Sequence, residues 1–181
     1  MMNNMTQTIK FLKVRDVKSP VRGTAEAAGI DFFVPNCDEK FITDLVQKNS
    51  SATLPVLVQV NDNQVYITIM PNSRVLIPSG IHGWLAPGTA LIAANKSGVA
   101  TKKGLVFGAQ VVDSDYSGEI HISVINTSNV PVTITGGEKL IQFIHTPVLL
   151  SPLEEVDKET YNKLHDKSER GAGGFGSTGT K

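Results

Sequence analysis

Residues 104–126 read GLVFGAQVVDSDYSGEIHISVIN, which is two apolar runs joined by a polar turn. The first run, Leu105 to Val112, leads straight into Asp113, and the second extends from Glu119 to Asn126. β-Branched residues favour strands, whereas the Asp, Ser and Gly between the runs favour a turn. The stretch therefore predicts a β-hairpin that fixes the Asp113 carboxylate beside a sheet, as a general base requires.

Further short runs of β-branched and aromatic residues lie on both sides of this stretch, and the gaps between them carry Gly, Pro, Asn or Asp. Many short strands separated by such turns indicate an all-β sandwich or jelly roll. Short strands are expected within Ile9–Val17 and within Gln64–Ile81, where Pro71-Asn72 and Pro78-Ser79-Gly80 are turn signals. Further strands are expected over Gly83–Ala94, Val130–Thr135 and Lys139–Leu150.

One amphipathic helix is expected from Asp38 to Lys48, with Asn36 or Asp38 as its cap. Its apolar residues recur at the spacing of a single helical face: Phe41, Ile42, Leu45 and Val46. Two strands joined around residues 61–63 are expected to follow the helix. Residues 37–63 are therefore interpreted as an insertion, either decoration on the exterior or a surface for a protein partner.

The composition limits the classes of function. With 181 residues, 40% of them hydrophobic, the chain can bury one full core, so we expect one β-sandwich domain over residues 1–150 and a linker with a C-terminal arm over residues 151–181. The 17 basic and 17 acidic residues are interspersed, which argues against binding to nucleic acid or a membrane surface. Cys37 stands alone, and no histidine spacing suits zinc. Without a signal peptide or a run of ~20 apolar residues, the chain is expected in the cytoplasm, or in a host's cytoplasm if it is viral.

The C-terminal residues 170–179 read RGAGGFGSTG. Glycines let backbone N–H groups approach phosphate oxygens, Arg170 offers a charged fork, and Ser177 and Thr178 add hydroxyl donors. Phe175 can stack on a base. Phosphate and base together indicate a nucleotide ligand, and a plain flexible terminus is the alternative.

A second candidate for phosphate binding is NKSGVATKKGL, residues 95–105, which places Lys96, Ser97 and Gly98 before a short helical stretch. The free N–H groups and the dipole of a helix start favour an anion. An ordinary capped turn is the alternative for this segment seen alone.

Five segments, taken in order, resemble the five signatures of the trimeric dUTPase family. They are AGID (28–31), NKSGVATKKGL (95–105), GAQVVDSDYSGE (108–119), GEKLIQF (137–143) and RGAGGFGSTG (170–179). The resemblance implies a jelly-roll-like dUTPase fold with a short inserted helix and a flexible glycine-rich arm. It also implies hydrolysis of dUTP to dUMP and pyrophosphate, which limits uracil incorporation into DNA and supplies dUMP for thymidylate synthesis.

The resemblance further implies roles for residues of the third segment. Asp113 would orient and deprotonate the attacking water. Tyr116 would pack against the deoxyribose and leave no room for a 2′-hydroxyl. Uracil would be read by main-chain groups of Ala109, Gln110, Val111 and Val112.

The remaining segments are expected to contact the phosphates and to close the site. Ser97 and Gly98 match phosphate-binding residues, Gln142 matches a glutamine beside them, and Lys96 stands where the family usually has arginine, which keeps the charge but loses the planar fork. The arm is expected to contribute Arg170, Phe175, Gly176, Ser177 and Thr178.

Magnesium is the expected cofactor, held mainly by triphosphate oxygens and water, with Asp31 either touching that hydration shell or serving the structure. The resemblance also implies a homotrimer whose sites lie between subunits. Two alternative functions are a dCTP deaminase-like enzyme of the same fold and a nucleotide-dependent regulator that binds a protein partner.

Overall fold

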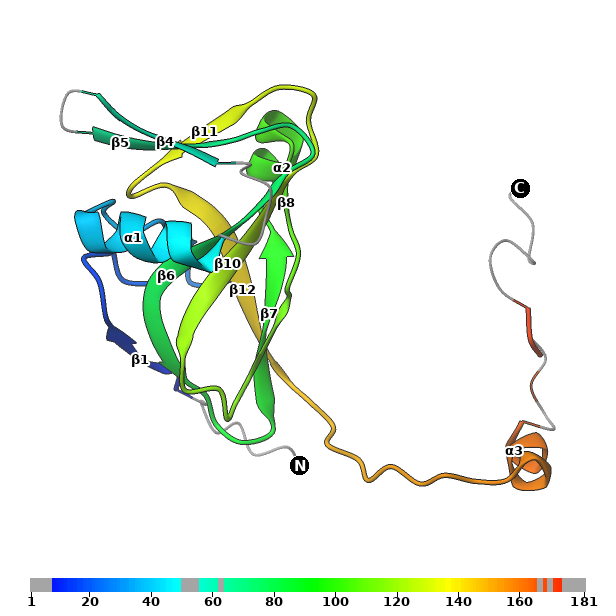
Figure 1. Ribbon diagram of the computed structural model, residues 1–181. Coiled ribbons are helices and arrows are strands. Elements are labelled where there is room, and N and C mark those ends of the chain that lie inside the picture. Colours follow the sequence, from blue (N-terminus) through cyan, green and yellow to red (C-terminus); the bar gives the residue numbers. More distant parts are fainter. Residues whose placement is uncertain (1–7, 50–55, 62–63, 166–167, 169–170, 174–181) are drawn as a thin grey trace. The chain divides into compact units, whose positions relative to one another are not determined.

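The computed structural model describes residues 8–49, 56–61, 64–165, 168 and 171–173. Internal contacts divide the chain into two units, Met1–Leu149 and Leu150–Lys181. The first unit contains three antiparallel sheets and the helices α1 (Glu39–Lys48) and α2 (Ser97–Lys103) (Figure 1). The second unit contains the helix α3 (Lys158–Leu164).

Two of the sheets pack face to face. The four-stranded sheet has the order β1, β6, β10, β8, which are Lys10–Lys13, Arg74–Trp84, Glu119–Asn126 and Leu105–Phe107. The five-stranded sheet has the order β2, β3, β12, β7, β9, which are Val21–Arg22, Gly29–Phe33, Lys139–Pro147, Thr89–Asn95 and Val111–Asp113. Alternate side chains of both sheets meet in one core, among them Ile120, Ile122, Val124, Phe32, Leu91 and Phe143. The expected all-β, jelly-roll-like architecture is confirmed.

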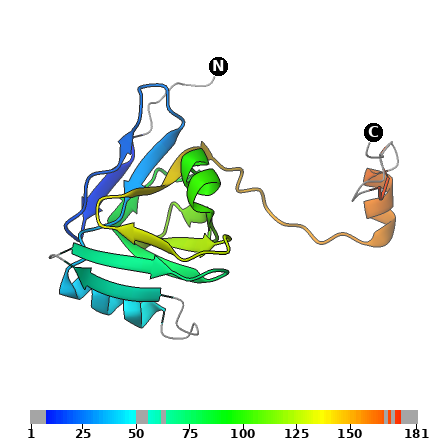
Figure 2. The same cartoon turned by 90° about the horizontal axis from the view of Figure 1, so that it is seen from above.

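The third sheet and the inserted helix α1 both contribute side chains to the core of this sandwich. The strand order of the sheet is β11, β5, β4, which are Val132–Thr135, Gln64–Ile69 and Val56–Asn61, and α1 lies beside it in both views (Figures 1 and 2). Asp38 caps α1 by accepting a hydrogen bond from the Phe41 N–H at 2.7 Å. Phe41 and Leu45 are buried, but Val46, expected on the same face, is 55% exposed. The helix and the two strands after it are thus confirmed, and residues 62–63 of their turn lie outside the described residues.

The expected single strand over Leu105–Val112 is wrong. The structure divides it into β8, which pairs with β10, and β9, which pairs with β7 in the other sheet. Between them, the Gly108 N–H donates to the Ser123 carbonyl at 3.0 Å before the chain crosses between sheets. Because β9 and β10 lie in different sheets, the predicted hairpin is instead a corner, which we call the β9–β10 corner (residues 113–119).

The polar segment after residue 150, expected as a linker, contains the helix α3. Asp157 accepts a hydrogen bond from the Thr160 N–H at 2.8 Å and caps α3, none of whose residues is buried. Among the described residues, no helix is both long and apolar enough to cross a membrane.

Candidate active site

Three of the predicted segments meet on adjacent strands at the carboxyl end of β7. Asp31 of β3 lies opposite Gln142 of β12, and Gln142 lies opposite Ala94 of β7. The Gln142 side chain donates from Nε2 to the Asn95 carbonyl at 3.0 Å. A Cβ at Gly29 would lie only 2.0 Å from Gln142 Oε1, so this position has to be glycine for Gln142 to take its place.

Asp31 is buried here, with 5% of its surface exposed, and both carboxylate oxygens have partners. Oδ1 accepts from Lys96 Nζ, and Oδ2 pairs with Lys139 Nζ at 3.1 Å. Burial raises the pKa of the Asp31 carboxyl, but the hydrogen bonds and charges of the two lysines outweigh burial and leave that pKa below its usual value. Lys96, expected to bind substrate, therefore forms an ion pair with Asp31 instead. The second partner, Lys139, is not predicted from the sequence.

Ser97 and Gly98 form the exposed first turn of α2. The backbone before them is extended at Lys96, whose side chain makes no capping hydrogen bond. The first N–H groups of an α-helix have no acceptor within the helix. We call Ser97, Gly98 and Gln142, with the Asp31–Lys96 pair, the α2 end of β7.

The β9–β10 corner lies at the other end of β7. Asp113 closes β9 opposite Ala90, its side chain is exposed, and its carbonyl accepts from the Tyr116 N–H at 3.2 Å. Beside it is a pocket of about 160 Å³, lined by Ala109, Val111, Val112, Asp113, Tyr116, Ile120, His121 and Phe143. This pocket thus brings together five residues that were predicted to contact the base, the sugar or the attacking water: Ala109, Val111, Val112, Asp113 and Tyr116. Gln110, which does not line it, accepts from the Ala93 N–H through its carbonyl at 2.7 Å.

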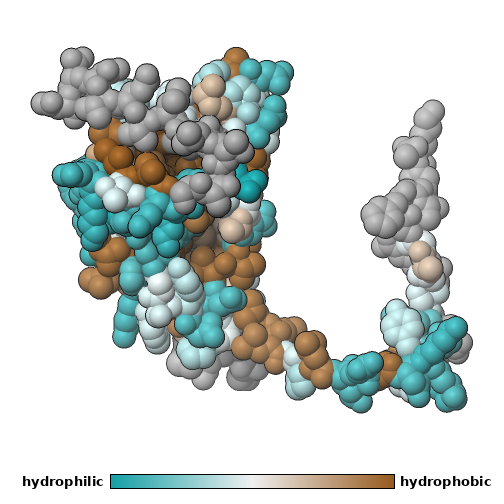
Figure 3. Space-filling model, in the orientation of Figure 1, coloured by the Kyte–Doolittle hydropathy of each residue, from teal (hydrophilic) through white to brown (hydrophobic). Residues whose placement is uncertain are grey.

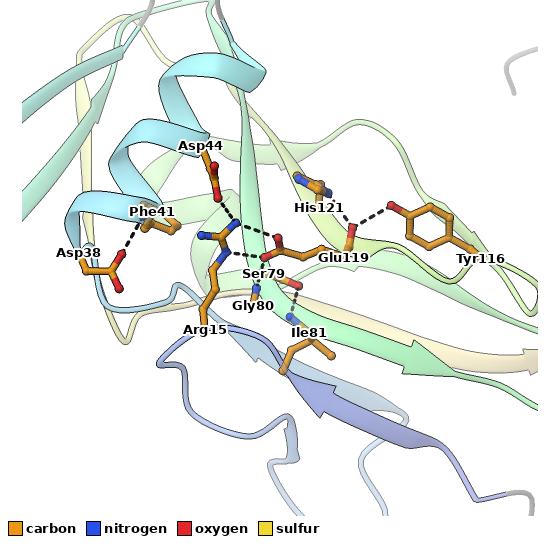
Figure 4. A network of polar contacts seen from close by, with 10 residues as sticks. All are labelled: Arg15, Asp38, Phe41, Asp44, Ser79, Gly80, Ile81, Tyr116, Glu119 and His121. Carbon is orange, nitrogen blue, oxygen red and sulfur yellow. Dashed lines mark hydrogen bonds and ion pairs between the residues drawn. The ribbon is translucent and has the colours of Figure 1, made fainter.

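Tyr116 is fixed by one hydrogen bond and one close contact. Its hydroxyl donates to the Glu119 carbonyl at 2.9 Å (Figure 4). A Cβ at Gly118 would lie 2.5 Å from that hydroxyl oxygen, so the ring needs a glycine beneath it. His121 Nδ1 lies 2.7 Å from the same carbonyl, and since a carbonyl only accepts, Nδ1 carries the hydrogen. Neither Glu119 nor His121 was predicted, because their roles depend on this fold of the corner.

The two ends are far apart within one chain. Asp113 pairs near the start of β7, and α2 begins just beyond its last residue, Asn95 (Figure 1). At about 3.4 Å per residue, the chain from Ala90 to Asn95 spans about 17 Å. The structure therefore brings Asp113 and Tyr116 together, and separately Ser97, Gly98 and Gln142.

A larger cavity of about 290 Å³ lies among β1, β2 and the sheet faces behind them, and it shares Ile120 with the pocket at the corner. Its lining is mostly apolar, with Arg22 and His145 as polar members, and none of the predicted site residues lines it. The size of a cavity therefore does not identify the site in this chain.

The predicted arm residues Arg170, Phe175, Gly176, Ser177 and Thr178 lie outside the described residues. Within the described part of the chain, no three His, Cys, Asp or Glu side chains gather as ligands for a metal ion.

Comparisons with known proteins agree on one family. Deoxyuridine 5'-triphosphate nucleotidohydrolase of Hahella chejuensis is 42% identical over 118 residues, 64% of this chain and 74% of the relative. The same-named protein of Pseudomonas putida is 40% identical over 113 residues, 61% of this chain and 71% of the relative.

Solved structures show a similar fold. A mutant of the Staphylococcus bacteriophage 80alpha dUTPase with dUpNHpp has a TM-score of 0.69 at 18% identity, covering 95% of this chain and 98% of its own. A mutant dUTPase from phage phi11 of S. aureus, described with a structural Mg(II) ion, has a TM-score of 0.63 at 16% identity, covering 83% of this chain and 97% of its own.

A model of the dUTPase family matches residues 60–179. The match begins after the segment AGID (28–31) and the inserted helix, and it contains the other four of the five segments. Since it spans more than half of the 181 residues and the curated relatives agree with it, the chain belongs to the dUTPase family.

Proposed function

We propose that this chain hydrolyses dUTP to dUMP and pyrophosphate, with Asp113 as the general base. Family membership and the names of the curated relatives support the reaction. The single observation that supports the base is its position: Asp113 ends a paired strand, is exposed to water, and lines a pocket together with Tyr116.

The proposed chemistry is an in-line displacement. The Asp113 carboxylate accepts a proton from a water molecule, whose oxygen bonds to the α-phosphorus. The bond from the α-phosphorus to the bridging oxygen breaks, and pyrophosphate leaves with the electron pair. A positioned base of this kind is worth about 10²- to 10⁴-fold in rate, so orientation and charge neutralisation supply the rest.

The β9–β10 corner is proposed to select the nucleoside. Main-chain groups of Ala109 to Val112 read uracil, and cytosine would leave buried polar groups unpaired at a cost of about 1 to 3 kcal/mol each. The Tyr116 ring stands against the deoxyribose. Its two constraints, the Glu119 carbonyl and Gly118, keep it where a 2′-hydroxyl would collide.

The α2 end of β7 is proposed to bind the phosphates, and here distance argues for a shared site. A reacting water and its phosphorus must approach to about 3 to 3.5 Å, whereas β7 separates Asp113 from Ser97 by about 17 Å or more. One α-phosphate therefore cannot meet both ends of a single chain. The site is completed by the α2 end of a second copy, as in the homotrimer that we propose.

Exposed leucines support association with other copies. Leu149, Leu150 and Leu153 follow β12 and are 95%, 78% and 101% exposed, and Figure 3 shows hydrophobic colour along this segment. Leucines as exposed as these would be stabilised by burial against another copy. The arm, residues 151–181, would then close a site with Arg170, Phe175, Gly176, Ser177 and Thr178.

Magnesium, when bound, would neutralise charge on the triphosphate oxygens. The described residues fit a metal held mainly by substrate and water better than one held by a protein cage. Both carboxylate oxygens of Asp31 pair with lysines and the residue is buried, so a structural role for Asp31 is favoured.

The first experiment offers dUTP, dCTP, dTTP and UTP separately to the purified chain with magnesium, and measures pyrophosphate and ammonia. Pyrophosphate from dUTP alone, lost in Asp113→Asn, is the expected result. Ammonia from dCTP would replace the proposal with a deaminase. Binding of dUTP without any product would replace it with a nucleotide-dependent regulator.

A further inference from the structure

The residue that anchors Tyr116 is itself anchored by a buried ionic network. Glu119 is the first residue of β10, and its carbonyl accepts from the Tyr116 hydroxyl. Its carboxylate accepts two hydrogen bonds from Arg15, Nε to Oε1 at 2.7 Å and Nη2 to Oε2 at 2.9 Å (Figure 4). Only 9% of the Arg15 side chain and 13% of the Glu119 side chain are exposed.

The Glu119 carboxylate also accepts a hydrogen bond from a backbone N–H that lies in a β-bulge of the neighbouring strand β6. Pairing of β10 with β6 shifts between Glu119, opposite His82, and His121, opposite Pro78. In this bulge the Gly80 N–H donates to Glu119 Oε1 at 2.7 Å. A bulge next to an active site changes the direction in which nearby side chains point. This bulge is held by the same Glu119 carboxylate that accepts hydrogen bonds from Arg15.

The second partner of Arg15 lies on the inserted helix. Nη2 of Arg15 pairs with Asp44 Oδ2 of α1 at 2.6 Å. The Phe41 ring centroid, on the buried face of α1, lies 6.0 Å from the Arg15 guanidinium carbon. The guanidinium is thus held between the insertion and the start of β10, and Nη1 has no hydrogen-bond partner among the described residues.

We propose that Arg15 is a positioning residue for sugar selection: by clamping Glu119, it fixes the Tyr116 hydroxyl and hence the ring that excludes a 2′-hydroxyl. This inference rests on the role proposed above for Tyr116. Arg15 acts only through Glu119, from 104 residues away in the chain. Asp44 makes the inserted helix part of the same clamp.

A purely structural ion pair would behave differently from this clamp. Loss of a structural pair lowers stability and scales the rates for all substrates alike. Loss of the clamp frees the Glu119 backbone, so the Tyr116 ring can move away from the sugar. The 2′-hydroxyl of UTP is then excluded less strongly, and UTP binds better relative to dUTP. The ratio of kcat/KM for dUTP to kcat/KM for UTP therefore separates the two roles.

The test measures that ratio in Arg15→Met, which removes the charge and the fork but keeps an unbranched apolar stem. We expect the ratio to fall about tenfold, because small displacements of a positioned group cost factors of this size or larger. Arg15→Lys keeps the charge without the fork and should fall between the wild type and Arg15→Met. Lys10→Met, which removes an exposed basic side chain of β1 that lies over the Trp84 ring, is the matched control and should leave the ratio unchanged.

A double-mutant cycle with Tyr116→Phe tests the route of the effect. Tyr116→Phe keeps the ring but removes the hydrogen bond to the Glu119 carbonyl. If Arg15 acts through that bond, Arg15→Met should add little to the ratio already lowered by Tyr116→Phe. Independent effects that multiply would overturn the proposal.

An unchanged ratio in a folded Arg15→Met trimer would also overturn it. If Arg15→Met does not fold, Arg15→Lys and Asp44→Asn decide the question by the same ratio. Absence of dUTP hydrolysis by the wild type would contradict the proposed function instead, and so is distinguishable from a failure of the clamp.

Discussion

The two ends of strand β7 are built in different ways. The β9–β10 corner is held by a series of hydrogen bonds: Tyr116 is bonded to Glu119, and Glu119 is bonded to Arg15 and Gly80 outside the corner. The α2 end presents exposed Ser97 and Gly98 at a helix start, above a buried Asp31 neutralised by lysines. A rigid pocket suits recognition of a base and a sugar, whereas open N–H groups suit phosphate oxygens.

This difference assigns separate tasks to regions that one chain cannot bring together. If the corner positions water and nucleoside while the α2 end binds phosphate, variants at the two ends should fail in different ways. Variants at opposite ends should also be able to compensate for one another in a mixed assembly.

The largest effect is expected from Asp113→Asn compared with Ser97→Asp. Asp113→Asn removes the base and should lower kcat by about 10²- to 10⁴-fold, with dUpNHpp still bound. Ser97→Asp keeps α2 stable, because a carboxylate suits a helix start, but it repels the triphosphate and should abolish tight binding. Turnover gives kcat, and calorimetric titration with dUpNHpp gives the affinity.

Equal loss of dUpNHpp binding in the two variants would contradict the proposal that the corner supplies the base while the α2 end binds the phosphates. Lys102→Gln, in the last turn of α2, is a control for general disturbance of that helix, and it should leave both kcat and affinity close to the wild type.

Mixing those two variants tests whether the ends come from different chains. When the variants are denatured and refolded together in equal amounts, random assembly should pair an intact corner with an intact α2 end in about a quarter of the sites. Activity should therefore return to about a quarter of the wild-type value, from two nearly inactive preparations. If one chain supplied both ends, no site would be intact and the mixture would stay inactive.

A smaller effect is expected from Gly29→Ala, which probes the α2 end alone. The new Cβ would occupy the place of Gln142 Oε1 and force that side chain away from the Asn95 carbonyl. We expect kcat/KM for dUTP to fall about tenfold through misplacement of Gln142. Gly23→Ala is the matched control, since nothing lies within 4 Å of a Cβ there.

The Gln142→Ala background sharpens this test. With the Gln142 side chain removed, Gly29→Ala has little to displace and should cause almost no additional loss of kcat/KM. A full additional loss would mean that Gly29 acts through another neighbour.

How far the sequence predicts the molecule depends on how local each signal is. The Asp38 cap and the spacing of Phe41 and Leu45 lie within one helix, so α1 was predicted correctly. The turn residues at 71–72 likewise separated β5 from β6, but β6 runs unbroken through the turn expected at residues 78–80. Five ordered segments predicted the family, and with it the fold.

Pairings between segments that are distant in the chain could not be predicted from local sequence patterns. Residues 105–107 and 111–113 are both apolar strands, and only pairing decides that one joins β10 and the other β7. Lys139 reaches Asp31, and Arg15 reaches Glu119, from segments that no sequence spacing connects. For the same reason, the separation of Asp113 from Ser97 became visible only from the register of β7.

The smallest effect concerns acid stability of the corner. Burial raises the pKa of the Glu119 carboxyl, but the Arg15 and Gly80 hydrogen bonds lower it further, so its net pKa is below the usual value. The folded state then binds fewer protons than the unfolded state, so the contribution is fully present above the unfolded pKa of about 4.3 and is lost as pH falls through the folded pKa. Glu119→Gln should cost on the order of 1–2 kcal/mol at pH 7 and progressively less below about pH 4.

Urea unfolding of wild type and Glu119→Gln between pH 7 and pH 3 measures this difference, with Glu159→Gln as the exposed control that should run parallel to the wild type. A constant gap across that range would mean that the Glu119 charge is not what stabilises the corner. Convergence of the two curves in acid would instead tie the Arg15–Glu119 clamp to the charge. The acid sensitivity that remains would then come from other carboxyls whose pKa is lowered in the folded chain, among them Asp31, Asp44 and Asp157.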